Sequence, residues 1–331
     1  MTASPSLAQI AEYPVLRLLN PGDGDCLVYF VGALAFAVGV ALWRRRNRRS
    51  VRLPALLRLL GSRRLWLHQS TRLDMKLYLM HSLLMVAAYG VFEASSEMWR
   101  AATDTGLIAL AGPAHPLHAA RWVVGTATTI VQVLSLELGY WALHYAFHRI
   151  PALWEVHKVH HSAEVMTPLT EWRQHPIEFI AFANVISVTN GAAFGAMGWL
   201  FGASAQPFTL FQMNALLVLH FATFHHIRHS GVWIAATGWL GRLVHSPAHH
   251  QIHHSTDPRH FGHNLGYALS VWDWVFGTLC VPERRGSVRL GVPGEPAYRG
   301  VVDTLVRPIR AMLPRRLKLR AGELSAPAPN A

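Results

Sequence analysis

The sequence predicts an all-α integral membrane protein with four to five transmembrane helices and a cytoplasmic, histidine-rich helical cap that holds a dimetal site. The first observation is composition: of 331 residues, 51% are hydrophobic and 15% are charged, and the hydrophobic residues fall in long blocks. The second is that four clusters of histidine lie between residues 144 and 254, close to these blocks. Blocks of this kind are unusual in a soluble protein.

Five apolar segments approach the roughly 20 residues that a helix needs to cross the hydrocarbon core of a bilayer. They are residues 26–43, 77–95, 122–143, 177–200 and 206–224. An arginine-rich block follows the first segment, and cytoplasmic loops carry such an excess of basic residues. The net charge of +12 therefore indicates a membrane surface rather than a nucleic acid partner. The block comprises Arg44, Arg45, Arg46, Arg48, Arg49, Arg52, Arg58, Arg63 and Arg64.

This cytoplasmic block sets the direction of the later spans. The second span runs outward, residues 96–121 form a short outer loop, and the third span returns inward near His144. Pro176 opens the fourth span, because a proline is tolerated in the first turn of a helix. A short connection at Gly202–Pro207 predicts a helical hairpin of spans four and five, which ends near His225. All four histidine clusters are then expected on the cytoplasmic side.

We divide the chain into three parts. Residues 1–121 are expected to hold the N-terminal transmembrane helices and the basic loop, and residues 122–285 the catalytic domain. Residues 286–331 are expected to hold a basic amphipathic helix at 301–320, on the membrane or packed on the domain, and a disordered tail. Residues 264–281 are apolar but contain an aspartate, which indicates a re-entrant or interfacial piece. Cys26 and Cys280 form no CxxC pattern and receive no function.

The histidine spacing points to metal binding, since residues three or four apart share one face of a helix. One cluster reads HxxxH, two read HxxHH, and in the third we favour the i, i+4 pair. Imidazole is the commonest metal-binding side chain near neutral pH. Ten of them exceed the four ligands of a structural zinc site and suit two metals. The predicted ligands are His144, His148, His157, His160, His161, His225, His229, His250, His253 and His254.

The other histidines and the nearby acids receive lesser roles. Isolated histidines are expected to be packing residues, namely His68, His81, His115, His118 and His220. Outer-sphere or merely adjacent roles are expected for His245 and His249, and His226 is the less favoured, i, i+3 partner of His229. His260 and His263 are ligands, substrate contacts or loop residues. Ligating histidines usually give their second N–H to a carboxylate or a carbonyl. The acids expected in that role are Glu155, Glu164, Glu171, Glu178 and Asp257. Arg173, His175 and Glu178 form either a polar network under the site or a helix-start cluster.

Imidazole suits zinc, copper, iron and nickel, and spacing alone does not choose among them. Redox iron with an open position for oxygen is the better match to so rich a ligand set. Catalytic residues other than the metal ligands are not identified.

These motifs resemble those of the fatty acid hydroxylase and sterol desaturase superfamily, in its bacterial branch. The resemblance covers roughly residues 120–285. It rests on the HxxxH and HxxHH boxes, on Ser246-Pro-Ala-His-His-Gln-Ile-His-His-Ser-Thr-Asp-Pro, on Asn264-Leu-Gly, on Trp272-Asp-Trp-Val-Phe-Gly-Thr and on Arg173-Gln-His-Pro-Ile-Glu178. It implies an integral-membrane, non-haem di-iron enzyme with O2 as co-substrate. It assigns eight ligands to the boxes and two more to an intervening pair, here His225 and His229. The arginine-rich block lies outside the pattern.

The function predicted is hydroxylation or desaturation of a lipid in a bacterial inner membrane. Sterol, carotenoid, fatty acyl chain, ether lipid and aminolipid all remain candidate substrates. The chain shows no haem, flavin or dinucleotide motif, so a separate electron-transfer protein is expected as partner. Two alternatives stay open: a di-zinc membrane lipid hydrolase, in which zinc activates water, and a divalent-metal transporter. Transporters bind ions near the bilayer midplane, whereas these clusters lie at one face.

Overall fold

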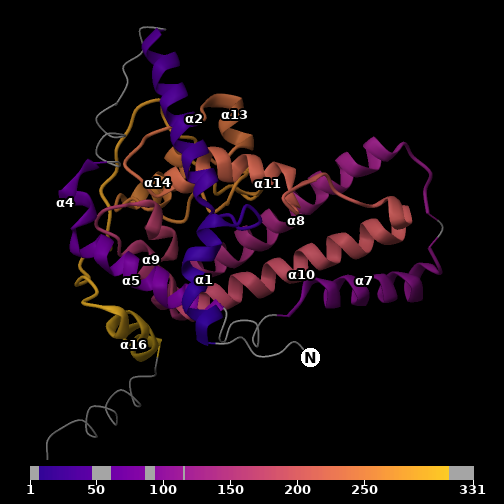
Figure 1. The fold of residues 1–331 in the computed structure, drawn as a ribbon, viewed down its shortest axis with the longest axis horizontal. Coiled ribbons are helices and arrows are strands. Elements are labelled where there is room, and N and C mark those ends of the chain that lie inside the picture. The colour runs from indigo at the N-terminus through magenta and orange to yellow at the C-terminus, as the bar shows by residue number, and fades with distance from the viewer. Residues whose placement is uncertain (1–6, 47–60, 86–93, 115, 313–331) are drawn as a thin grey trace, which may run out of the picture.

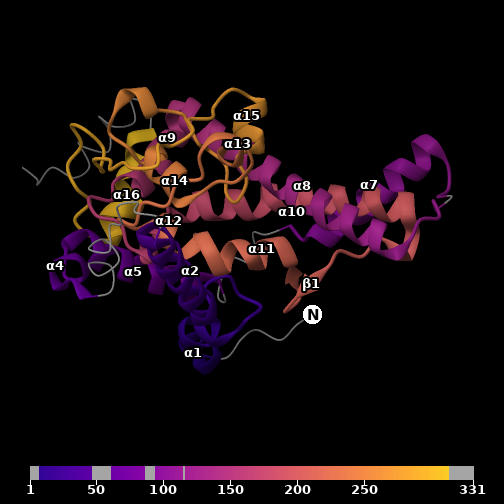
Figure 2. The ribbon, with the colours of Figure 1, turned by 90° about the horizontal axis from the view of Figure 1, so that it is seen from above.

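The computed structural model describes residues 7–46, 61–85, 94–114 and 116–312, and they are mostly helical, as predicted. Figure 1 shows two parts. Helices α7 (Ser96–Ala111), α8 (Arg121–Arg149) and α10 (Pro176–Phe201) form a long arm. At one end of the arm, the C-terminus of α8 and the N-terminus of α10 enter a block of shorter elements (Figure 2). This block carries the histidine clusters.

The remaining elements are short, apart from three near the N-terminus. The helices are α1 (Leu7–Leu19), α2 (Leu27–Arg46), α4 (Arg63–Trp66), α5 (Gln69–Leu84), α9 (Pro151–His161), α11 (Ala215–His220), α12 (His226–Arg228), α13 (Gly238–Leu243), α14 (Pro247–His253), α15 (Val271–Val275) and α16 (Val301–Met312). The 3-10 helices are η2 (Pro168–Trp172), η3 (Gly202–Ser204) and η5 (Pro258–His260), and η4 (Phe221–His225) is a π-helix. Strands β1 (Thr209–Leu210) and β2 (Met213–Asn214) pair antiparallel.

Three helices in the described residues are long and apolar enough to cross a membrane: Leu27–Arg44, Arg121–Arg149 and Pro176–Ser204. Four to five spans are therefore not confirmed. At 1.5 Å per residue, the 29 residues of α8 extend about 43 Å, against a hydrocarbon core of about 30 Å. The excess length lets the last turns of α8, which carry two histidines, emerge into the block.

Helix α2 runs across α8 and α10 rather than beside them (Figures 1 and 2). Ala33 and Ala37 of α2 pack on Ile227 and Ile234 of the block. Near its C-terminus, Arg44 donates to the carbonyl oxygen of Trp233 at 3.3 Å. The start of the arginine-rich block thus lies at the histidine end of the molecule, whereas Arg48 and the arginines up to 58 are outside the described residues.

Two expected spans have another structure. Residues 77–84 belong to α5, a helix that buries polar side chains and packs against η2, and Ser95 caps α7. Residues 86–93 are outside the described part, so the second span stays a prediction. Residues 206–224 do not form one helix. Phe211 and Gln212 both adopt positive φ (52° and 65°) and close the hairpin of β1 and β2. The helix that follows begins only at Ala215, so the expected helical hairpin is wrong.

The expected outer loop at 96–121 is also wrong, because most of it forms α7. Ser95 caps this helix by accepting from the Met98 amide at 3.2 Å, and Gly112 ends it at a φ of 86°. Helix α7 packs closely on α10. A Cβ added at Gly191 would lie 2.4 Å from the Ser96 carbonyl oxygen, and one at Gly195 would lie 2.7 Å from that of Arg100. Small residues four apart commonly let two helices approach in this way.

The last two expected elements are partly realised. Residues 264–281 contain only the short helix α15, and its Asp273 is buried. A helix does form in 301–320, as α16, up to Met312; the rest lies outside the described residues. Helix α16 packs near α9, with Met312 against the buried Phe147 and Val156.

Candidate metal centre

Nine of the ten predicted histidine ligands lie in two adjoining groups, in each of which the candidate donor atoms are within 4.8 Å of one another. Histidine group A comprises His144, His148, His157, His161 and His253. Histidine group B comprises His160, His229, His250 and His254. The two groups touch, since the ring of His161 stacks on that of His254 with centroids 4.5 Å apart.

Helical spacing explains how four short segments supply both groups. The i, i+4 pairs are His144 with His148 on α8, His157 with His161 on α9, and His250 with His254 at α14. The first two pairs enter group A and the third enters group B. The middle histidine of each HxxHH motif crosses to the other group: His160 of α9 joins group B, and His253 of α14 joins group A. Each motif therefore serves both groups.

The ring nitrogens converge at the spacing of ligands around a cation. In group A, the Nε2 atoms of His144, His148 and His161 each lie 3.1 Å from that of His157. In group B, His229 Nε2 lies 3.2 Å from that of His160 and 2.7 Å from that of His250. Metal–nitrogen bonds of about 2.1 Å place neighbouring ligands at right angles about 3.0 Å apart. The spacing fits one metal ion in each group.

Hydrogen bonding alone does not account for this convergence. A neutral imidazole carries one hydrogen, and that of His157 is on Nδ1, which donates to Glu178 Oε1 at 2.8 Å. The Nε2 atom of His157 then offers only a lone pair to its three neighbours. Nitrogen lone pairs that point at one another, with no hydrogen between them, cost free energy when they are buried. A metal ion in each group satisfies them, so the residues present fit the dimetal centre that the motifs predict.

The Nδ1 atoms are held from outside the groups, which points Nε2 inward. His144 donates to the Leu265 carbonyl at 2.7 Å, and His253 to the His263 carbonyl at 3.0 Å. In group B, His229 Nδ1 lies 3.0 Å from Glu171 Oε2. Such partners fix the tautomer and the ring orientation of a metal ligand. Glu171 and Glu178 thus take the orienting role expected of them, whereas Glu155 pairs with Lys158 and Asp257 with Arg259.

Burial keeps these imidazoles neutral. It lowers the pKa of His229 and that of His253 from 6.5 to about 4. Burial and neighbouring imidazoles hold the pKa of His161 and that of His254 well below the ordinary value. A metal binds the neutral ring, so the ligand set is ready at neutral pH without first losing protons.

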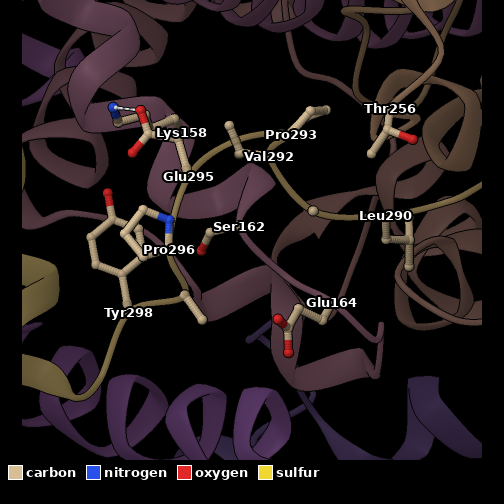
Figure 3. Close-up of a pocket in the computed structure, with 12 residues that line it drawn as sticks. Lys158, Ser162, Glu164, Thr256, Leu290, Val292, Pro293, Glu295, Pro296 and Tyr298 are labelled. Carbon is tan, nitrogen blue, oxygen red and sulfur yellow. Dashed lines mark hydrogen bonds and ion pairs between the residues drawn. The ribbon is translucent and has the colours of Figure 1, made fainter.

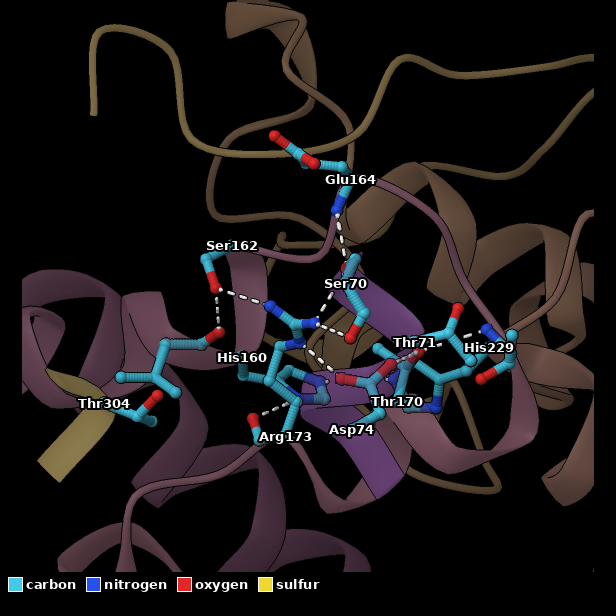
Figure 4. Close-up of polar contacts among 12 residues, drawn as sticks. Ser70, Thr71, Asp74, His160, Ser162, Glu164, Thr170, Arg173, His229 and Thr304 are labelled. Atoms are coloured by element: carbon cyan, nitrogen blue, oxygen red, sulfur yellow. Dashed lines mark hydrogen bonds and ion pairs between the residues drawn. The ribbon is translucent and has the colours of Figure 1, made fainter. Parts of the chain in front are cut away.

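A buried ion pair supports group B (Figure 4). The Arg173 guanidinium donates from Nε to Asp74 Oδ1 at 2.6 Å and from Nη2 to the Ser70 carbonyl at 2.6 Å. The Arg173 carbonyl in turn accepts from His160 Nδ1 at 3.3 Å. Of the two roles expected for this set, His175 and Glu178 take that of a helix start: His175 caps α10 by accepting from the Ile177 amide, and Glu178 lies in its first turn. Asp74 was not among the candidates, although a charge beside an apolar segment is a signal for it.

Two further buried carboxylates hold the loop that orients His144. Glu137 accepts from the backbone amides of Tyr267 and Ala268 at 3.0 and 2.7 Å. Asp273 accepts from the amides of Leu265 and Gly266, both at 2.8 Å. The Leu265 carbonyl is thereby fixed against His144. Sequence reasoning missed both roles, although Glu137 is the acid inside the predicted span 122–143.

His225 lies outside both groups. The π-helix η4 ends at His225, and α12 ends at Arg228, so His225 and His229 do not share an uninterrupted α-helical face. His225 instead lies with His226 and Asp25. The favoured i, i+4 pairing in this cluster is therefore absent from the structure.

The other histidines are mostly engaged elsewhere. His68 caps α5, His81 bonds the Gln174 carbonyl and His118 is exposed, while His115 is outside the described residues. Both nitrogens of His249 have partners, at Ser246 and at the Gly241 carbonyl. His220, His245, His260 and His263 belong to neither group.

A cavity of about 450 Å³ opens beside group A. His148, His161 and His253 line it, together with Arg149, Trp154, Phe261 and the chain at 291–293. A smaller pocket of about 170 Å³ shares residues 291–293 with this cavity (Figure 3). There, Lys158 binds Glu295 Oε1 at 3.0 Å. No histidine lines the smaller pocket, so the larger cavity is the one at the histidines.

Comparison with known proteins agrees with this geometry. Residues 129–278 match the family model described as Fatty acid hydroxylase. Alkylglycerol monooxygenase of Danio rerio is 27% identical over 148 residues, which is 44% of this chain and 29% of that protein. Ornithine lipid hydroxylase OlsE of Rhizobium tropici is 26% identical over 205 residues, 60% of this chain and 56% of that protein. Very-long-chain aldehyde decarbonylase GL1-1 of Oryza sativa subsp. indica is 28% identical over 170 residues, 50% of this chain and 25% of that protein.

The chain thus spans less than two thirds of the length of these relatives. No solved structure matches it. The matched residues hold every member of histidine groups A and B. Residues 129–278 therefore match a fatty acid hydroxylase domain, and this match and the relatives support the superfamily that the histidine motifs predicted.

Proposed function

We propose that this protein is a membrane-bound di-iron oxygenase that hydroxylates a lipid, with O2 as co-substrate and electrons from a separate protein. Desaturation is the closely related outcome at the same centre. The observation that carries the proposal is the pair of adjoining histidine groups inside a fatty acid hydroxylase domain. Two iron ions held there would supply the oxidising power to attack an unactivated C–H bond with O2.

The residues of the chain have three tasks in this proposal. The nine imidazoles hold the metals, and Glu171 and Glu178 orient two of them. The buried positions of the rings keep bulk water away from the centre. The cavity beside group A positions the substrate against it, since its volume of about 450 Å³ is in the usual range for small-molecule sites.

The cavity has the mixed lining that an amphiphile requires. Trp154, Phe261 and Pro293 supply apolar walls, and Arg149 supplies a positive charge at the end of α8. Because α8 is a candidate span, its end is expected near the lipid headgroups. A lipid with its chain at the histidines and its headgroup near Arg149 fits this arrangement. The relatives support the class, since the names of two of them specify an alkylglycerol and an ornithine lipid.

We place the histidine block on the cytoplasmic side of a bacterial inner membrane. The beginning of the arginine-rich block, at Arg44, contacts the histidine block, and such basic segments face the cytoplasm. The electron donor would then dock from the cytoplasm.

The test compares lipid extracts from cells that carry the wild-type gene, His161→Ala, or His118→Ala. His161 belongs to group A and lines the cavity, whereas His118 is exposed and outside both groups. Mass spectrometry should find a lipid that gains one oxygen atom, or loses two hydrogens, with the wild type and His118→Ala but not with His161→Ala. Purified His161→Ala should also hold less metal.

Growth without oxygen separates oxidation from hydrolysis. An oxygenase makes no product under anaerobic conditions, whereas a zinc hydrolase is unaffected. A cleaved lipid that forms equally well without oxygen, or an unchanged product with His161→Ala, would overturn the proposal.

A further inference from the structure

A second place in the molecule has the make-up of a metal site, and it shares no residue with histidine groups A and B. Asp25, in the turn between α1 and α2, faces His225 and His226 at the junction of η4 and α12. The donor atoms of the three side chains lie within 4.8 Å of one another. His225 is 7% exposed and His226 is 8% exposed. We name these three residues the Asp25 group.

The two imidazoles are oriented as metal ligands are. His226 Nε2 is buried and has no hydrogen-bond partner among the described residues. His225 Nδ1 lies 3.1 Å from the hydroxyl of Tyr267. Its Nε2 then faces Asp25 Oδ1 at 3.8 Å, too far for a hydrogen bond. An outward N–H bonded to a carbonyl or hydroxyl, with the other nitrogen free, is the usual state of a ligating histidine.

Charge also favours a cation here. Arg17 binds both Asp25, at 2.8 Å, and Asp23, at 3.0 Å. One guanidinium thus offsets two carboxylates, which leaves one negative charge in a mostly buried place. The other cation nearby, Arg228, is paired with Glu171.

We infer that Asp25, His225 and His226 bind a third metal ion, separate from the dimetal centre. Two imidazoles and one carboxylate suit a divalent transition metal, and Zn²⁺, with a water in the fourth position, is the best match. His225 and His226 belong to the fatty acid hydroxylase domain, whereas Asp25 precedes it. The ion would therefore fasten the turn between α1 and α2 to the catalytic domain.

The test uses the full-length protein with histidine groups A and B disabled by His157→Ala and His250→Ala. After treatment with a chelator, this double variant should bind one Zn²⁺ per chain, and binding should raise its melting temperature. Adding His226→Gln or Asp25→Asn should remove both effects. Asp23→Asn is the matched control, because Asp23 binds the same arginine from the same turn but is outside the Asp25 group.

A second arm keeps the dimetal centre intact, in case the double variant does not fold. The metal content of the otherwise wild-type protein should fall by one ion per chain with His226→Gln and stay unchanged with Asp23→Asn. Equal metal content in the wild type and His226→Gln would overturn the third site and leave the proposed function standing. If cells with the wild-type gene form no oxidised lipid, while His226→Gln still holds one ion fewer than the wild type, the proposed function alone would be overturned.

Discussion

At the scale of single residues, the geometry of the candidate metal centre depends on groups outside the two histidine groups. Helical spacing within the motifs places the histidines on shared faces, so nine ligand candidates were predictable from the sequence. Their orientation was not, because Leu265, Glu171 and Glu178 come from other segments. His225 shows most clearly what helical spacing in the sequence does not predict. Its i, i+4 relation to His229 holds in the sequence, but the π-helix at 221–225 turns it toward Asp25.

Glu178 gives the most direct test of this orienting role. Glu178→Gln keeps an acceptor for His157 Nδ1 but replaces the carboxyl group that orients the ring with an amide. We expect the affinity for the group A metal to fall about tenfold, the lower end of the usual effect of such partners. Competition with a chelator measures it. Glu164→Gln is the control, because Glu164 is exposed; an equal loss of affinity in both variants would refute the orienting role.

The ion pair of Asp74 and Arg173 makes a separate prediction about stability. Asp74→Asn leaves the Arg173 guanidinium buried without its counter-charge. Removing one partner of a buried pair typically costs about 3–5 kcal/mol, so the melting temperature in detergent should drop sharply. The double variant Asp74→Leu with Arg173→Met should recover much of the loss, because no charge then stays buried. A double variant that is less stable than Asp74→Asn would contradict this account.

At the scale of elements, hydropathy located α2, α8 and α10 but misjudged what lies between them. Apolar content predicts burial but does not say against what, and the described part of this region, α5, packs on η2. Gly112, Pro113 and Pro116 favour a loop at 96–121. Helix α7 forms there because Gly191 and Gly195 of α10 leave room for its backbone, a tertiary effect that a local pattern does not display.

Substituting the glycines of α10 therefore tests whether α7 packs on α10 as the structure shows. Gly195→Leu places a side chain where a Cβ already meets the Arg100 carbonyl at 2.7 Å and Thr103 Cβ at 2.7 Å. Helix α7 must then move away, and we expect a loss of more than about 2 kcal/mol, as in other overpacked contacts. Gly198→Leu is the matched control, since nothing lies within 4 Å of a Cβ there. Thermal unfolding in detergent measures both; equal melting temperatures for the two variants would show that the α7–α10 contact does not form.

At the scale of the whole molecule, so many buried neutral imidazoles make stability depend on pH. Burial lowers the pKa of His229, His249 and His253 from 6.5 to about 4. Between pH 6.5 and 4 the unfolded chain binds protons that the folded chain refuses, so the free energy of unfolding falls as the pH falls. Each such histidine contributes at most about 3 kcal/mol by pH 4.

The melting temperature of the metal-free protein should accordingly be constant above about pH 7 and fall steeply from pH 6.5 toward 4. Bound metal should delay the fall, because it competes with protons for the same nitrogens. A metal-free melting temperature that stays constant down to pH 5 would mean that these rings are not buried and neutral.

Orientation in the membrane is a second property of the whole molecule. Gly61, just before α4, and Arg259, in η5, are exposed, and so is His118, just before α8. Helix α4 lies at the histidine end of the molecule, and α8 begins at the far end of the arm (Figure 1). Single cysteines at these positions, with Cys26 and Cys280 replaced by alanine, can be labelled with a membrane-impermeant reagent. We expect labels at 61 and 259 only from the cytoplasmic side, and at 118 only from the opposite side. Labelling of all three from one side would exclude α8 as a span.

The central claim is that two metal ions bind side by side, one in each histidine group. Elemental analysis of purified wild type, His157→Ala, His250→Ala and the double variant tests it most directly. The account predicts one ion fewer per chain in each single variant and two fewer in the double variant, with the helical content preserved. The same metal content in all four folded proteins would contradict it.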